Sequence, residues 1–143
     1  MNQYARKGVV GLLRRGTSFL VIQRSAEVVA PLKWCFPGGG IQEGETEEAA
    51  LKREFQEELG ISILPQARIC ASVTPWNVHL SWWFVEATDD ALQTLHPDSR
   101  EVQAVRWMSL ETLYRHPDAL VSNLPILEQL MREEKIAFSG KHC

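Results

Sequence analysis

Glutamates are concentrated in one short part of this chain of 143 residues. Seven of its fourteen glutamates fall within the sixteen residues from Glu43 to Glu58. Only Lys52 and Arg53 offset them, so the segment carries −5, while the whole chain carries −3 and the remainder +2. Crowded carboxylates are hard oxygen ligands that suit Mg²⁺ or Mn²⁺. A metal site and a solvated acidic helix face are the two interpretations of this run.

The residues around the run predict a helix. Thr46 is a plausible N-cap, and Glu47 and Glu48 follow in the first turn, where the helix dipole favours anions. Gly60 stands where a glycine typically ends a helix. We therefore expect a helix that begins after Thr46 and ends at Leu59.

The apolar stripe of this helix is bordered by carboxylates. At 100° per residue, one face is formed by Leu51, Phe55 and Leu59. Along the edge of that face, rather than opposite it, lie Glu54, Glu57 and Glu58. Like charges on adjacent turns repel each other by roughly 0.2–0.5 kcal/mol per pair in water. Helix stability does not require this arrangement, and a divalent cation would remove the repulsion.

Two neighbouring features favour a site over a solvated face. The helix follows Pro37-Gly38-Gly39-Gly40, a loop with little side chain to keep a ligand or metal from its backbone. Arg53 lies one turn from Glu57, so it can orient that carboxylate or neutralise part of the cluster.

The spacing of these residues resembles a known signature. The chain has Gly39, five residues, Glu45, seven residues, and then Arg53–Ile61, which reads REFQEELGI. This resembles the Nudix box of the MutT-like pyrophosphohydrolases, in which G, five residues, E and seven residues precede REUxEExGU, where U is a bulky aliphatic residue. Phe55 at the first U is the only departure, and it is still apolar. The preceding WCFPGG of residues 34–39 resembles the usual lead-in.

The resemblance implies a fold and an activity. The fold would be α/β, a Nudix-type α/β/α sandwich with a mixed β-sheet, formed as one Nudix hydrolase domain by residues 1–143. The enzyme would be a metal-dependent pyrophosphohydrolase, cleaving a phosphoanhydride bond in a nucleoside diphosphate linked to another moiety. Its small-molecule substrate would be a nucleotide, a nucleotide sugar such as ADP-ribose, or a damaged nucleoside triphosphate. The alternatives are a catalytically inert Nudix-fold module that binds or senses a nucleotide, and an interaction domain whose acidic helix contacts basic partners.

The resemblance also implies roles for individual residues. Mg²⁺ or Mn²⁺ would be held by Glu54, Glu57, Glu58 and the backbone carbonyl of Gly39. Arg53 would orient the glutamates, and Glu45 would support the metal. The ions would neutralise phosphate oxygens, align them for in-line attack and make a bound water more acidic. The general base for that water would be one of the box glutamates or Glu101. Alternatively, Glu101 is a solvated loop residue.

Residues outside the box give weaker indications of the substrate. Pro75, fourteen residues after Ile61, resembles the downstream proline of many ADP-ribose-type Nudix enzymes, although prolines favour turns in any case. Trp83 shares a strand face with polar residues, where it could stack on a nucleobase; alternatively, Trp83 and Val85 pack under the C-terminal helix.

Three more residues have two interpretations each. Arg24 is either a contact for a substrate phosphate or a surface arginine. His79 is either a substrate contact or a histidine with structural hydrogen bonds. Trp34, next to the glycine loop, either shapes the pocket or belongs to the core.

The other elements must place the helix against a sheet. Apolar runs predict strands over residues 9–14, 19–24 and 33–36, the first two forming a hairpin. Ile69, Ala71 and Val73 alternate with polar residues, and after Pro75 the apolar phase flips to residues 76, 78, 80, 82 and 84, which predicts two strands and a turn. A polar loop over residues 88–100, a strand over 102–108, a short helix capped by Ser109 and a last helix over 123–135 follow.

Composition bounds the class of protein. The chain is 45% hydrophobic, too apolar for a disordered protein, and no run reaches the roughly 20 apolar residues of a membrane helix. Cys35, Cys70 and Cys143 are widely spaced, which favours reduced thiols over a disulfide framework. Without a signal-like N-terminus, we expect a cytoplasmic protein that binds neither bulk nucleic acid nor a membrane. Exposed apolar strand positions are compatible with a homodimer.

Overall fold

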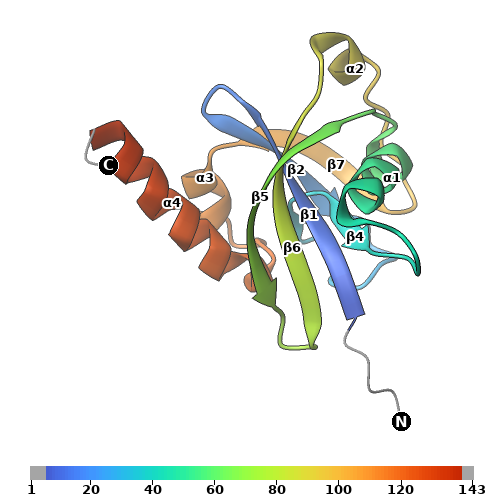
Figure 1. Ribbon diagram of the computed structural model, residues 1–143, viewed down its shortest axis with the longest axis horizontal. Coiled ribbons are helices and arrows are strands. Elements are labelled where there is room, and N and C mark those ends of the chain that lie inside the picture. The colour runs from blue at the N-terminus through green and yellow to red at the C-terminus, as the bar shows by residue number, and fades with distance from the viewer. Residues whose placement is uncertain (1–5, 140–143) are drawn as a thin grey trace.

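A long N-terminal strand connects the two halves of a mixed sheet. The structure is a computed structural model that describes residues 6–139, with side chains described to residue 133. β1 (Arg6–Arg15) pairs in parallel with β6 (Val78–Glu86) and antiparallel with β2 (Ser18–Arg24) and β4 (Gly38–Gly40). The predicted hairpin and the predicted mixed sheet are confirmed (Figure 1).

Three further strands extend the sheet. β3 (Trp34–Cys35) and β7 (Val102–Met108) both pair with β2, and β5 (Leu64–Val73) pairs with β6 across the predicted turn. The strand order is β3-β2-β1-β6-β5, with β4 beside β1 and β7 beside β2. β4, which contains the glycines that precede the acidic helix, therefore lies beside β1, the middle strand of this order.

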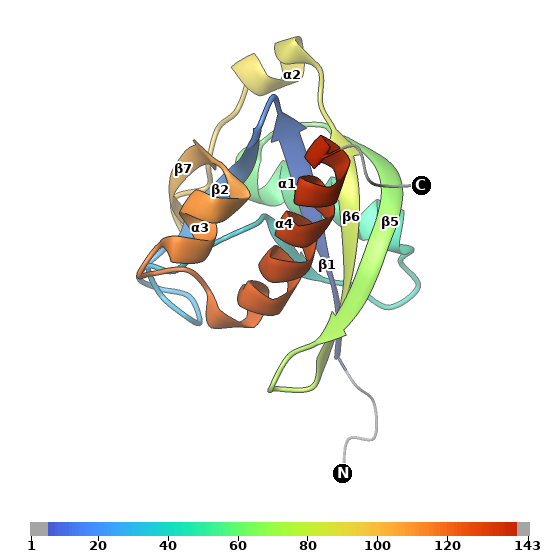
Figure 2. The same cartoon turned by 90° about the vertical axis from the view of Figure 1, so that its left-hand side faces the viewer.

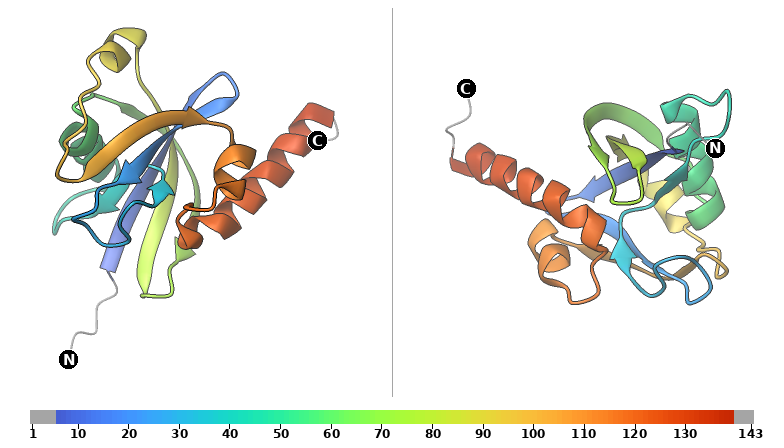
Figure 3. Two further views of the ribbon diagram at one scale, coloured as in Figure 1. Left: turned by 180° about the vertical axis from the view of Figure 1, so that it is seen from behind. Right: turned by 90° about the horizontal axis from the view of Figure 1, so that it is seen from below.

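Helices cover both faces of the sheet. α1 (Glu47–Leu59) lies on one side, and α3 (Leu110–Arg115) and α4 (Leu124–Ser139) lie on the other (Figures 1 and 2). The view from below shows the same separation of α1 from α4 (Figure 3). A 3₁₀ turn (Val121–Asn123) leads into α4, and Ser109 caps α3 as predicted. This arrangement confirms the α/β/α sandwich.

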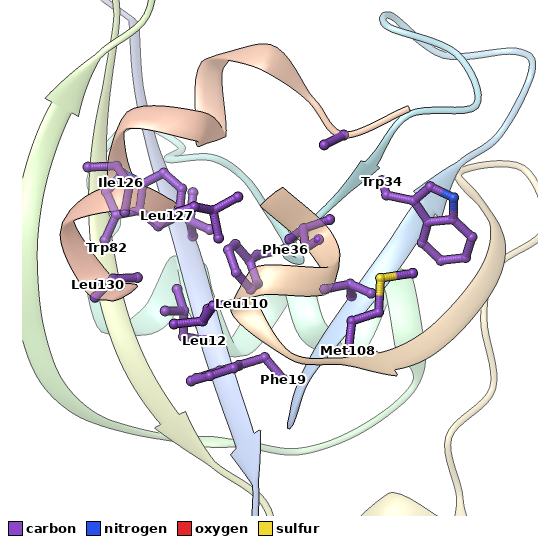
Figure 4. Close-up of a cluster of buried hydrophobic side chains, with 14 residues drawn as sticks. Leu12, Phe19, Trp34, Phe36, Trp82, Met108, Leu110, Ile126, Leu127 and Leu130 are labelled. Carbon is purple, nitrogen blue, oxygen red and sulfur yellow. The ribbon is translucent and has the colours of Figure 1, made fainter. Parts of the chain in front are cut away.

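Each face of the sheet has its own hydrophobic cluster. The cluster on the α4 side includes the fully buried Leu12, Trp82 and Leu127 (Figure 4). The cluster on the α1 side joins residues of β1, β2 and β6 to the predicted helix stripe, Leu51, Phe55 and Leu59. The stripe is completely buried, as its spacing predicts.

Trp83 and Val85 lie beneath α1. Both pack in the α1-side cluster, whereas the adjacent Trp82 packs on the α4 side. The interpretation that placed Trp83 and Val85 under the C-terminal helix is therefore wrong. The reason is that a strand presents successive side chains to opposite faces of its sheet, and Trp82 takes the face toward α4.

The expected polar loop over residues 88–100 contains a helix, α2 (Asp89–Gln93). Its cap explains its presence, because the Thr88 hydroxyl accepts a hydrogen bond from the Ala91 N–H at 3.1 Å. The prediction of an unbroken loop here is wrong.

The expected alternation in β5 is interrupted. The register with β6 shifts between Arg68 and Cys70, so Cys70 and Ser72 face the α4 side, where the Ser72 hydroxyl accepts a hydrogen bond from Trp82 Nε1 at 2.9 Å. Val73 is 58% exposed. A β-bulge of this kind resets the two-residue period, so the apolar set of Ile69, Ala71 and Val73 does not form one buried face.

Two further expectations concern thiols and membranes. Cys35 and Cys70 are free thiols, as predicted, and Cys143 lies outside the described residues. Within the described part of the chain, every helix is too short or too polar to cross a membrane.

Candidate active site

α1 begins and ends where the sequence predicts. The Thr46 hydroxyl accepts a hydrogen bond from the Ala49 N–H at 3.1 Å, which satisfies one free donor of the first turn. Gly60 adopts φ = 67°, a left-handed conformation that glycine tolerates, and its N–H donates to the Gln56 carbonyl at 3.0 Å. The caps fix the length of the helix that carries the acidic residues.

The glutamates on the edge of α1 differ in burial. Glu54 and Glu58 are only 9% and 6% exposed, whereas Glu57 is exposed. The two buried carboxylates lie against β4, and the third reaches solvent beside them.

Arg53 connects the carboxylates to the glycine loop. Its Nε and Nη2 donate to the Glu45 carboxylate at 2.7 and 2.9 Å. Its Nη1 donates to Glu54 at 2.8 Å and to Glu57 at 3.2 Å, and Nη2 also donates to the Gly40 carbonyl at 2.7 Å. The predicted pairing with Glu57 is confirmed, and one guanidinium holds three carboxylates in place.

β4 packs directly on the buried carboxylates. The Gly38 N–H donates to Glu58 Oε1 at 3.1 Å. A Cβ atom on Gly39 would lie 2.4 Å from Cδ of Glu54, so only glycine leaves room for that carboxyl group. Close packing against the buried carboxylates is therefore a second reason for glycine at these positions, besides the approach of a ligand to the backbone.

The environment changes the pKa values of these groups in opposite directions. Burial, the largest cause, raises the pKa of both Glu54 and Glu58, and the charge of Glu54 raises that of Glu58 further. Hydrogen bonds from Arg53 hold the pKa of Glu45 down at about 2. The site thus contains one firmly ionised carboxylate, that of Glu45, and two carboxylates, those of Glu54 and Glu58, whose charged form is unfavourable.

Two predicted residues from other segments lie near the buried carboxylates. Besides burial, the charge of Glu101 raises the pKa of Glu54 and Glu58, and the charge of Arg24 lowers that of Glu58. Arg24 Nε donates to the Val29 carbonyl at 2.6 Å, which anchors the side chain at the end of β2. The structure therefore brings Arg24 and Glu101 to the acidic edge of α1.

Comparison with known proteins decides the family. A model of the NUDIX domain matches residues 5–130, most of the chain. The chain belongs to the Nudix family. Its resemblance to the Nudix box is thus confirmed, and α1 is its Nudix helix.

Curated Nudix relatives match over most of their length. The chain is 31% identical over 126 residues to the CTP pyrophosphohydrolase of Escherichia coli, covering 86% of this chain and 89% of the relative. It is 33% identical over 129 residues to the 8-oxo-dGTP diphosphatase of Escherichia coli, covering 86% and 94%. The crystal structure of the MutT protein from Methanosarcina mazei matches with a TM-score of 0.74 over 91% of this chain and 95% of that chain; at 22% identity, it shows the shared fold.

Membership of the Nudix family makes this chain a hydrolase of acid anhydrides in phosphorus-containing compounds. The active hydrolase is thereby favoured over the inert binding module and over the interaction domain.

The carboxylates of the Nudix helix are engaged with protein donors. Among the described residues, no three acidic, histidine or cysteine side chains converge into a ready-made ion site. Glu54 and Glu57 accept from Arg53, and Glu58 accepts from the Gly38 N–H. A metal ion would compete with these donors for the same oxygens.

Trp83 and His79 occupy different surroundings on β6. Trp83 Nε1 donates to Glu47 Oε1 at 2.8 Å, and Arg68 Nε donates to the same oxygen at 3.2 Å. Trp83 is therefore tied to the first turn of the Nudix helix. His79 is exposed near the start of β6, paired in register with Lys7 of β1.

Asn123 is a buried polar residue that the sequence pattern does not reveal. It is 4% exposed, and its Oδ1 accepts no hydrogen bond from any described residue. Its turn is joined to β3, because the Leu120 N–H donates to the Trp34 carbonyl at 2.9 Å, and β3 leads to the glycine loop. Trp34 itself is 4% exposed and packs in the α4-side cluster, which confirms that it belongs to the core.

Proposed function

We propose that this Nudix hydrolase is a metal-dependent pyrophosphohydrolase, cleaving a phosphoanhydride bond in a nucleoside diphosphate linked to another moiety. The observation that carries the proposal is the buried pair of carboxylates, Glu54 and Glu58, crowded together against the glycine backbone of β4. Burying like charges side by side is unfavourable unless a cation joins them. The arrangement therefore supports a function that needs that cation.

The donor set fits Mg²⁺ or Mn²⁺, which prefer hard oxygen ligands. The groups proposed to hold the ion are the carboxylates of Glu54, Glu57 and Glu58 and the carbonyl of Gly39. When bound, the ion neutralises phosphate oxygens and makes a bound water more acidic.

The protein's own groups divide the remaining work. Arg53 orients the carboxylates that it holds. Glu101 or one of the box glutamates takes the proton from the attacking water. Arg24 offers its positive charge to a substrate phosphate. Trp83 and His79 remain proposed substrate contacts, to be tested by their effect on KM.

Nucleotides are the proposed class of substrate. The two relatives are named for CTP and for 8-oxo-dGTP, and these names support our proposing nucleoside triphosphates, a damaged one included, before nucleotide sugars such as ADP-ribose. The turn between β5 and β6 explains the presence of Pro75 without any role in substrate binding.

Asn123 is a candidate acceptor for a base N–H, because a buried amide oxygen without a partner gains a full hydrogen bond from such a donor.

A substrate panel tests the proposal. The protein is incubated with Mg²⁺ or Mn²⁺ and with nucleoside triphosphates, oxidised dGTP, ADP-ribose, dinucleoside polyphosphates or nucleotide sugars, and phosphate and nucleotide release are followed. We expect turnover that EDTA abolishes, and a large loss of kcat in Glu57→Gln and Glu58→Gln. Glu111→Gln, in an exposed side chain of α3, serves as the control.

Undiminished turnover in Glu57→Gln and Glu58→Gln, or no turnover of any substrate by the wild type, would contradict the proposal. An unchanged KM in Trp83→Ala would show that Trp83 does not stack on the substrate.

A further inference from the structure

The loop before β7 is bonded to the end of the Nudix helix. The His96 N–H donates to the Leu59 carbonyl at 2.7 Å, and the Asp98 N–H donates to the Glu58 carbonyl at 2.9 Å. These bonds satisfy carbonyl groups that the last turn of a helix leaves free. The loop therefore keeps a fixed distance from the residue that carries a buried box carboxylate.

Asp98 also fixes the backbone that follows it. Its carbonyl accepts hydrogen bonds from the N–H groups of Glu101 at 3.0 Å and Val102 at 2.8 Å. Its carboxylate Oδ1 accepts from the Arg100 N–H at 3.0 Å, which is the geometry of an Asx turn. Asp98 thus links Glu58 on one side to Glu101 on the other.

Ser25 holds the same backbone from the opposite side. It is 4% exposed and directly follows Arg24 at the end of β2. Its N–H donates to the Glu101 carbonyl at 2.9 Å, and its hydroxyl donates to the Arg100 carbonyl at 2.8 Å. Ser25 therefore donates hydrogen bonds to the backbone carbonyls of both Arg100 and Glu101.

We propose that Ser25 and Asp98 are positioning residues that hold Glu101 against the acidic edge of the Nudix helix. The proposal rests on the proposed function, in which Glu101 serves the reacting water. The negative charge of Glu101 acts on the buried carboxylates of Glu54 and Glu58 and is repelled by them, so a freely moving loop would carry it away. The bonds to Ser25 and Asp98 leave the backbone of Glu101 no such freedom.

Kinetics of Ser25→Ala and of a pair of variants at Asp98 test the role. Ser25→Ala should lower kcat between about 10- and 100-fold and leave KM within about twofold, because misplacing a catalytic group affects the reaction more than binding. Asp98→Ala should behave likewise, and Asp98→Asn should recover most of the activity, since its amide oxygen can still accept from the Arg100 N–H. Ser109→Ala is the matched control: it removes the cap of α3 and lowers stability without touching this loop.

A double-mutant cycle with Glu101→Gln distinguishes positioning from a general structural role. If Ser25 acts through Glu101, Ser25→Ala should cost little further kcat in the Glu101→Gln background. Equal losses in both backgrounds, or a Ser25→Ala that loses stability like Ser109→Ala but keeps its kcat, would overturn the inference. If Ser25→Ala does not fold, the Asp98 pair gives the same test. A fully active Glu101→Gln beside an inactive Glu57→Gln would overturn this inference alone, whereas a fully active Glu57→Gln would overturn the proposed function.

Discussion

The two buried carboxylates of the Nudix helix, Glu54 and Glu58, destabilise the fold although the proposed activity needs them. Removing a carboxylate from water disfavours its charged form, and the neighbouring carboxylate adds repulsion. Both effects act on Glu58, where the Gly38 N–H and the charge of Arg24 oppose them. The charged site therefore lowers the stability of the metal-free fold near neutral pH.

Glu58→Gln should make the metal-free protein more stable at neutral pH. Because the pKa of Glu58 is raised in the folded state, the carboxyl favours folding below its unfolded value near 4.5, and this contribution is lost as the pH rises through the folded value. The amide keeps an oxygen for the Gly38 N–H but carries no charge. Urea unfolding in EDTA should show a gain on the order of 1 kcal/mol at neutral pH, vanishing toward pH 4.5.

Two other glutamates control this measurement. Glu57→Gln, in an exposed side chain, should unfold close to the wild-type midpoint. Glu45→Gln should be less stable than the wild type at neutral pH, because the pKa of Glu45 is held near 2 and its stabilisation is lost only as the pH falls toward that value. A Glu58→Gln variant less stable than the wild type at neutral pH would contradict the expected sign.

Arg53→Lys should lower kcat although it keeps the positive charge. The planar guanidinium of Arg53 reaches three carboxylates and the Gly40 carbonyl at once, which the compact ammonium of lysine cannot do. We expect a loss of about 10- to 100-fold in kcat, measured on the best substrate beside Lys52→Arg, an exposed neighbour that should keep full activity. Wild-type kcat in Arg53→Lys would show that charge alone suffices.

Helical spacing predicts only those contacts that stay within the helix. Arg53 and Glu57 are one turn apart, so their pairing follows from the sequence. Glu45 and Gly40 reach Arg53 through the path of the loop before α1, which no period encodes. The burial of Asn123 is not predicted for the same reason, since it depends on how the turn that contains Asn123 packs against β3.

At the scale of elements, the site is a helix packed on a strand without side chains. β4 pairs with β1 through Val9 opposite Gly39 and Val10 opposite Gly38, so its backbone is fixed by the sheet. The Nudix helix can approach it closely only because glycine leaves the space that Glu54 fills.

Gly39→Ala should disrupt the site, and Gly40→Ala should not. A Cβ atom at Gly39 would lie 2.4 Å from Cδ of Glu54, whereas at Gly40 its nearest neighbour would be the Lys7 carbonyl oxygen at 3.9 Å. We expect kcat to fall by about 100-fold in Gly39→Ala, because the displaced carboxylate leaves its bonded position. Gly40→Ala should stay within about twofold in kcat and near the wild-type Tm. Equal activities of the two variants would show that Glu54 relocates without consequence.

The elements that the sequence predicts best are those with local signals. Thr46 and Gly60 mark the ends of α1, and Ser109 marks the start of α3, because each cap acts within one turn. The bulge in β5 and the short α2 are not predicted. The bulge depends on pairing with β6, and α2 is a single turn or so within a polar segment.

Across the whole molecule, the parallel pairing of β1 with β6 aligns the side chains of the two strands, with Trp83 opposite Gly11 and Val85 opposite Leu13 in the layer under α1. That pairing joins residues about seventy positions apart and leaves no trace in local periodicity. The sequence therefore predicts the layers correctly but cannot assign Trp83 and Val85 to the layer under α1. The same arrangement brings Arg24 and Glu101 to the acidic edge of α1, within the segment of charge −5, so charge is far from evenly spread.

Mg²⁺ or Mn²⁺ should consequently stabilise the entire fold. Binding to the folded state alone contributes about 2.7 kcal/mol when the metal concentration is 100 times Kd. For a chain of 143 residues, that corresponds to a rise in Tm on the order of 10 °C, measured by thermal unfolding. Glu57→Gln should lose most of the rise, and Glu111→Gln should keep it. KCl at the same ionic strength separates binding from screening: if KCl raises Tm as much as MgCl₂, relief of repulsion along the acidic edge needs no bound ion, and the carboxylates of the Nudix helix are not a metal site.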